Sequence, residues 1–139
     1  RRGSRKGRRK RSMHTRLPGA WWSFVLPRCA ESVAFGYIAH TNPSEAGEFA
    51  IEYQAKPTDH PQTLLRRVTR QVCPETEHCG SLRIRAYTEF VRVPARARVT
   101  IRVLHLEEGA FLEITNVVMS NCSRATLPRR IKAAAGVPP

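Results

Sequence analysis

The chain has 139 residues, of which 41% are hydrophobic, and its formal net charge is +13. This length fits one domain with tails rather than two domains, and the hydrophobic content excludes a wholly disordered chain. No apolar run approaches the roughly 20 residues needed to cross a bilayer, so we expect no membrane insertion. The basic surplus favours polyanionic partners such as nucleic acid or heparan-type glycans.

The first eleven residues hold eight of the 24 basic side chains. Like charges at this density repel one another, so we expect residues 1–16 to form a disordered basic arm. The end of this run matches the pattern that furin-like proprotein convertases cleave, and the same residues would also suit a polyanion. We therefore assign either processing or polyanion binding to Arg8, Arg9, Lys10 and Arg11.

Three segments in the first half of the chain have the residue pattern of strands. Residues 21–26 and 33–39 are rich in aromatic and β-branched residues, and Gly36 is the expected position of a bulge. Residues 48–55 alternate between apolar and polar side chains, which indicates a half-buried strand.

The segment DHPQTLLRRVTRQV has the strongest helical pattern in the chain. Asp59 stands three residues before a glutamine, as in a capping box, and a proline lies in the first turn. Leu65, Val68 and Val72 recur at the spacing of one helix face. The sequence therefore predicts a short amphipathic helix near 60–72.

Alternating residues return in the last third of the chain. In SLRIRAYTEF we expect the apolar Ile84 and Ala86 to face inward, and in RARVTIRVLHL the odd-numbered residues after Arg96. This alternation places His105 in the core. A hairpin turn is predicted at Glu107–Gly109.

Several short strands with one helix predict a mainly β (α+β) fold, either a β-sandwich or an open barrel. We expect a single folded domain over residues 17–127, followed by a flexible tail rich in Pro and Ala at residues 128–139.

Four cysteines lie within the expected folded part, and four cysteines allow three pairings. We favour a short bridge between Cys73 and Cys79 and a long bridge between Cys29 and Cys122. An even cysteine count in a small domain is typical of secreted proteins, and the alternative is four reduced thiols in a cytosolic protein.

A zinc site would compete with the short bridge, because Cys73, His78 and Cys79 with His60 offer two sulfur and two nitrogen ligands. Their spacing differs from the paired spacings of zinc sites, so we expect no metal site and no cofactor. No catalytic constellation stands out, so we expect no enzymatic activity and assign no catalytic residue.

Asn121-Cys122-Ser123 is an N-x-S sequon, and Asn121 is the candidate glycosylation site. Together with the cysteines and the convertase pattern, this sequon favours a secreted or extracellular location.

Arginines alternate with apolar residues in the last two strand-like runs. If those two strands pair, the outward arginines become neighbours, and adjacent like charges cost stability unless an anion lies among them. The guanidinium fork suits sulfate and carboxylate. The alternative is an ordinary solvated face. The candidate polyanion-binding face comprises Arg83, Arg85, Arg92, Arg96, Arg98 and Arg102.

The leading hypothesis is a secreted, disulfide-stabilised binding module or ligand. It would recognise a receptor or another extracellular protein, and an anionic glycan on the arginine-rich face. The alternative is a nucleic-acid-associated structural protein, such as a viral coat or ribosomal component, whose arm binds RNA and whose cysteines stay reduced.

Overall fold

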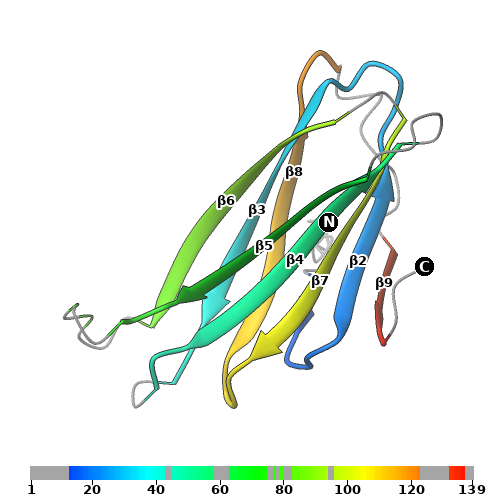
Figure 1. Cartoon of the computed structure of the whole chain (residues 1–139). Helices are drawn as coiled ribbons and strands as arrows, with labels where there is room; N and C mark the ends of the chain where they lie inside the picture. The colour runs from blue at the N-terminus through cyan, green and yellow to red at the C-terminus, as the bar shows by residue number, and fades with distance from the viewer. Residues whose placement is uncertain are drawn as a thin grey trace, which may run out of the picture.

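The computed structural model describes residues 13–42, 45–57, 63–74, 77, 79, 83–93, 96–122 and 132–136, which form two antiparallel sheets (Figure 1). One sheet contains, in spatial order, β1 (Met13–Thr15), β8 (Phe111–Met119), β3 (Ser32–His40) and β6 (Ile84–Arg92). The other contains β5 (Leu64–Gln71), β4 (Glu48–Lys56), β7 (Arg98–Leu106), β2 (Ala20–Val25) and β9 (Lys132–Ala135).

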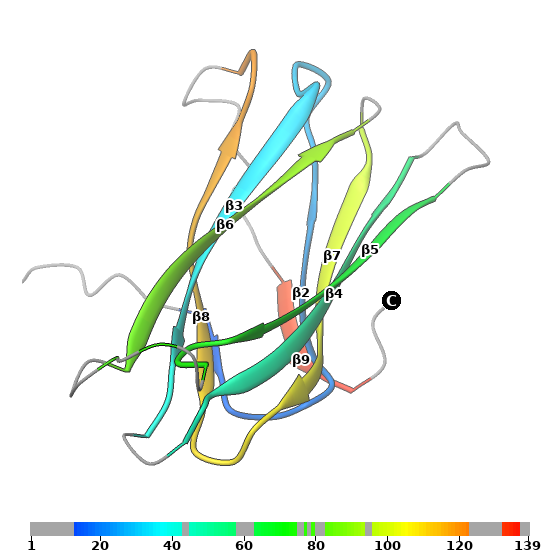
Figure 2. The same ribbon diagram turned by 60° about the vertical axis from the view of Figure 1, so that its left-hand side comes forward.

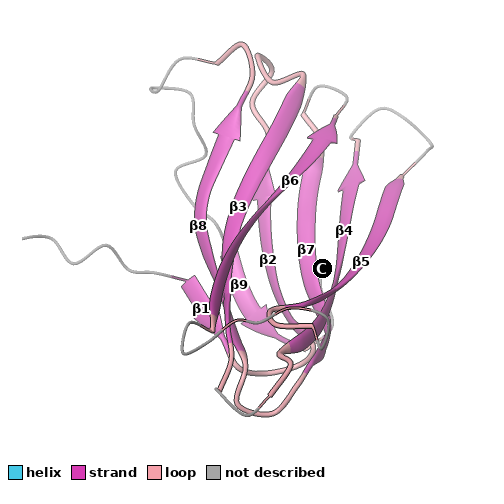
Figure 3. Cartoon of the chain, turned by 90° about the vertical axis from the view of Figure 1, so that its left-hand side faces the viewer, coloured by secondary structure: helices cyan, strands magenta, loops and turns pink. Residues whose placement is uncertain are grey.

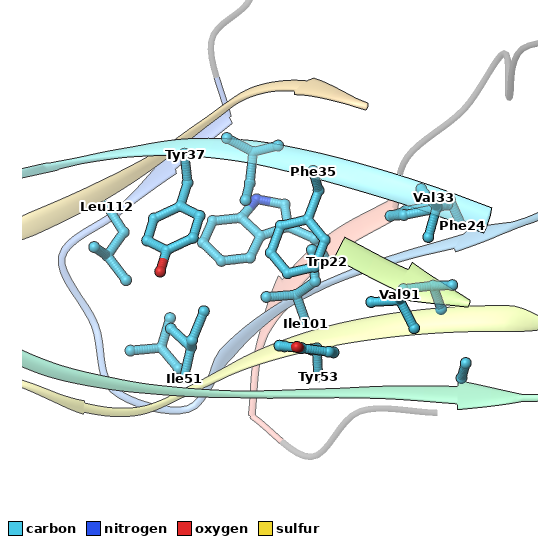
Figure 4. Close-up of a cluster of buried hydrophobic side chains, with 14 of the residues drawn as sticks. Trp22, Phe24, Val33, Phe35, Tyr37, Ile51, Tyr53, Val91, Ile101 and Leu112 are labelled. Carbon is cyan, nitrogen blue, oxygen red and sulfur yellow. The ribbon is translucent and has the colours of Figure 1, made fainter. Parts of the chain in front are cut away.

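The two sheets lie on opposite sides of a shared core, which confirms the predicted β-sandwich (Figures 2 and 3). The core is formed by alternate residues of the long strands, because successive side chains of a strand point to opposite faces. Phe35 on β3 meets Tyr53 on β4 edge to face, with ring centroids 5.3 Å apart. Trp22 on β2 is also buried between the sheets (Figure 4).

The predicted helix near 60–72 is wrong. Residues 64–71 form β5, which pairs with β4 from Glu48 opposite Gln71 to Ala55 opposite Leu64. Residues 58–62, including the expected cap, lie outside the described residues. The long antiparallel pairing satisfies the backbone groups of β5, and this tertiary contact overrides a weak local helical preference.

Two short strands extend the sheets into segments that we expected to lie outside the folded domain. β1 pairs with β8 along one edge of the four-stranded sheet, within the expected basic arm. β9 pairs with β2 along one edge of the five-stranded sheet, within the expected flexible tail.

The predicted irregularity at Gly36 is confirmed. The register of β3 with β8 shifts between Gly36 and Tyr37, so that Thr115 is an extra residue on β8. A Cβ atom on Gly36 would meet Oδ1 of Asn116 at 2.0 Å, which is far too close. Glycine is therefore required here so that the Asn116 side chain can lie across β3.

A polar cluster joins the two sheets where β5 and β6 form their neighbouring edges. Arg70 on β5 donates to the buried carboxylate of Glu89 on β6, with Nη2 2.6 Å from Oε1. The hydroxyl of Tyr37 donates to the same oxygen at 3.0 Å. The Arg70 guanidinium also lies 4.9 Å from the ring centroid of Tyr87. Burial raises the pKa of Tyr37, and the adjacent Glu89 raises it further, so Tyr37 remains a proton donor to the carboxylate.

Both predicted disulfides form. Cys29 joins Cys122 with Cα atoms 5.3 Å apart, and Cys73 joins Cys79 with Cα atoms 6.0 Å apart. The long bridge links the connection between β2 and β3 to the turn after β8, and therefore ties the two sheets together at one end. The short bridge closes a loop between β5 and β6.

We expect the two disulfides to contribute unequally to stability. In the loop-entropy model, a bridge spanning 93 residues contributes about 4.6 kcal/mol and one spanning six residues about 2.3 kcal/mol. Urea denaturation of Cys29→Ala/Cys122→Ala and Cys73→Ala/Cys79→Ala should therefore show the larger loss for the first pair. An equal or reversed order would contradict this account.

Loss of Arg70 should destabilise the fold because it leaves Glu89 buried without its charged partner. For Arg70→Met we expect a loss of about 2 kcal/mol, below the usual cost of breaking a buried pair because the Arg70 side chain is 35% exposed. In Arg70→Met/Glu89→Gln we expect part of that stability to return. A double-mutant cycle by chemical denaturation measures the difference, and strictly additive losses would show that the pair is uncoupled.

Candidate functional site

The six arginines of the predicted polyanion-binding face do not share one face. β6 and β7 belong to different sheets, so the assumption that these strands pair is wrong. Arg92 lies on β6 in the four-stranded sheet, and Arg98 and Arg102 lie on β7 in the five-stranded sheet. Arg96 lies in the connection between the two strands, where its φ is 62°. Since the chain crosses from one sheet to the other here, consecutive strands are not neighbours.

The orientation of β6 is also the reverse of the prediction. Ile84 is 58% exposed on the outer side, whereas Arg85 lies on the same side of the strand as the buried Glu89. Arg85 forms an ion pair with Glu77, and this hydrogen bond lowers the pKa of the Glu77 carboxyl. Arg85 is therefore already neutralised by a side chain of the protein. Arg83 immediately precedes β6 and is half-buried.

The five-stranded sheet carries a different cluster of cations on its outer side. Lys56 on β4 lies directly opposite Arg98 on β7. Two strands further across the sheet, Lys132 lies opposite Ser23. Arg102 follows on the same side of β7, between Glu52 and Trp21. We call this surface the basic face; it comprises Lys56, Arg98, Arg102 and Lys132.

The basic face has few acidic groups to balance it. Glu52 is its acidic neighbour, and Glu52 already accepts a hydrogen bond from Arg67 on β5 at 2.7 Å. Within the described residues, Nε of Arg102 and Nε1 of Trp21 are buried and have no hydrogen-bond partner. The face therefore combines like charges with unsatisfied donors, an arrangement that favours an anionic acceptor.

The outer side of the four-stranded sheet is apolar, and the sequence analysis missed this surface. Phe90 is 58% exposed and Val118 is 55% exposed. These residues were hard to find because an exposed strand face and a buried one have the same two-residue repeat. We call this surface the apolar face; it comprises Ala34, Ile38, Ile84, Ala86, Phe90, Phe111 and Val118.

The candidate glycosylation site lies at the end of β8. Asn121 is exposed, and its φ of 59° is in the left-handed region that asparagine tolerates. It lies on the rim of a hollow of about 430 Å³, which Phe90 and Arg92 also line. Ser123, the last residue of the sequon, lies outside the described residues, as do Arg8, Arg9, Lys10 and Arg11.

The alternative zinc site loses two of its four ligands. Cys73 and Cys79 form a disulfide and are therefore not available as thiolates. His60 and His78 lie outside the described residues. In the part of the chain that the structure describes, no group of three His, Cys, Asp or Glu side chains could hold a metal ion.

These features define a disulfide-stabilised β-sandwich-like domain with two chemically distinct outer faces. Two disulfides in a chain of this size are typical of proteins from oxidising compartments. The described residues contain no helix that is long and apolar enough to span a membrane. No family model, curated protein or solved structure matches the chain.

Proposed function

We propose that this protein is a secreted binding module that holds an anionic glycan on its basic face while it recognises an extracellular protein. The observation that carries the proposal is the direct opposition of Lys56 and Arg98 within a cluster of four cations. A sulfated glycan supplies the charge that this cluster lacks, and its sulfates accept hydrogen bonds from both ammonium and guanidinium groups.

The energetic argument concerns the cost of the unbound face. Like charges directly opposite each other on a sheet are destabilising, and a bound polyanion relieves that repulsion. The net charge of +13 draws an anionic partner toward the protein from a distance. Charge of this kind accelerates encounter and makes binding sensitive to salt, while specificity comes from shape and hydrogen bonds.

The secreted location and the role of the basic arm belong to the same proposal. The two disulfides support an oxidising environment. Arg8, Arg9, Lys10 and Arg11 then form a site for convertase cleavage or an additional polyanion contact. The module acts by binding rather than by catalysis, as a ligand of a receptor or of another extracellular protein.

The nucleic-acid alternative assumed reduced cysteines, and the two disulfides speak against it. RNA nevertheless competes for the same cations, because phosphates and sulfates offer similar acceptors. RNA is therefore included in the binding experiment.

Neutralising Lys56 and Arg98 should weaken binding to heparin. For Lys56→Gln/Arg98→Gln we expect the affinity at physiological salt to fall roughly tenfold or more, since a cation near an anionic surface contributes about 1 kcal/mol. Titration calorimetry over a salt series, with heparin and with single-stranded RNA, measures the effect.

The matched control is Arg28→Gln/Arg92→Gln, which removes the same charge from exposed positions outside the basic face. We expect this control to retain most of the heparin affinity. Equal losses in both double variants would show that only the total charge matters, and tight RNA binding without heparin binding would replace this proposal with the alternative.

Asn121 should carry an N-linked glycan when the chain passes through the secretory pathway. Digestion with peptide N-glycosidase should lower the mass of the secreted protein by one glycan, and Asn121→Gln should remove that shift. Mass spectrometry provides the measurement, and a secreted wild-type chain without the shift would show that the sequon is not used.

A further inference from the structure

We infer that the apolar face of the four-stranded sheet binds a second copy of this chain, so that the protein forms a dimer through face-to-face packing of these sheets. This inference goes beyond the proposed function, because it concerns the opposite sheet and does not depend on glycan binding.

The strand register arranges the apolar face in rows that cross β6, β3 and β8. Phe90, Ala34 and Val118 form one row, because Ala34 pairs with Phe90 on one side and with Val118 on the other. Ile84 and Phe111 flank His40 in a second row. The larger exposed apolar groups thus lie on the two flanking strands, whereas much of the middle strand is small.

A two-fold axis along β3 would match every row to itself. That rotation brings β6 of one copy over β8 of the other and keeps each row at the same height. Phe90 then meets Val118 of the second copy, Ile84 meets Phe111, and the Ile38 side chains meet on the axis. Since the operation is two-fold, each of the flanking contacts occurs twice.

The polar residues of this face fit the same arrangement. Thr88 and Asn116 lie on either side of Gly36 in a row between the apolar ones. The axis places Thr88 of one copy over Asn116 of the other, where hydroxyl and carboxamide can both donate and accept. Such a row in an otherwise apolar interface fixes the register of the two sheets.

Charge favours a second copy as the occupant. Two chains of net charge +13 repel each other, so they associate only through a surface of low charge. On the outer side of the four-stranded sheet, Glu113 has an imidazole beside it, since Nε2 of His40 lies 3.9 Å from Glu113 Oε2. Arg92 lies at the end of β6, outside the apolar rows. The basic face of the other sheet stays remote from the contact.

The size of the apolar face sets the expected strength of the dimer. Strands of nine residues at about 3.3 Å per residue, spaced about 4.8 Å apart, make these three strands a face about 30 Å long and 14 Å wide. This is at the low end of specific interfaces. We therefore expect a reversible dimer that dissociates on dilution, and that gains affinity at higher salt because salt screens the mutual repulsion.

The first test compares Phe90→Lys with the matched variant Leu65→Lys. Leu65 is 51% exposed on β5, away from the apolar face, so both variants replace an exposed apolar side chain with the same cation. Sedimentation velocity of the full secreted chain over a concentration series should show dimers for wild type and for Leu65→Lys. For Phe90→Lys the dissociation constant should rise by about 100-fold or more.

The second test uses the predicted contact between positions 90 and 118. Val118→Glu alone should also be monomeric, but a mixture of Phe90→Lys and Val118→Glu should form a one-to-one dimer. In that dimer the new lysine faces the new glutamate, and the second contact of Phe90 with Val118 is native.

A wild-type chain that is monomeric at every concentration would overturn the inference. So would equal dissociation of the Phe90→Lys and Leu65→Lys variants, or a mixture that stays monomeric. The heparin affinity of Phe90→Lys, measured in parallel, separates this outcome from failure of the basic face.

Discussion

Burial of one side of each long strand between the two sheets determines where the remaining side chains lie. A strand has only two sides, so once the aromatic and β-branched residues face inward, the intervening residues must form an outer face. Trp22, Phe35 and Tyr53 supply the buried aromatic rings (Figure 4). The outer faces are not constrained by this packing, and in this protein they have diverged into a basic surface and an apolar surface.

The strands with the clearest alternation were predictable from sequence. Phe49, Ile51 and Tyr53 are buried on β4 as expected, as are Val99 and Ile101 on β7. Both disulfides were also predictable, because the cysteines bracket the strand-rich part of the chain. In these cases the signal is local or depends on a small number of pairings.

The errors arise where the decisive contact is distant in sequence. Leu65 and Val68 fit a helix face as well as a strand, and the pairing of β5 with β4 selects the strand. The inner side of β6 includes Glu89, which is acceptable in the core because Arg70 reaches it from the other sheet. Nothing close to Glu89 in the sequence announces that partner.

Two local features also escaped the sequence pattern. The register of β4 with β7 shifts between Ala50 and Ile51, and beyond this shift His105 is exposed rather than buried, 3.5 Å from Glu48. The turn at Glu107–Gly109 forms, but it joins strands of different sheets and is not a hairpin. A two-residue repeat carries no information about which sheet a strand enters, and this choice divides the arginines of β6 and β7.

The position of the long disulfide has a consequence for proteolysis. Six strands, β3 to β8, lie between Cys29 and Cys122, so a peptide bond cut anywhere in that span leaves both fragments covalently joined. A cut after Arg11 lies outside the span, and the basic arm would be shed at once. The same covalent link that keeps a nicked body in one piece therefore gives no protection to the arm, and only reduction would separate the pieces of the body.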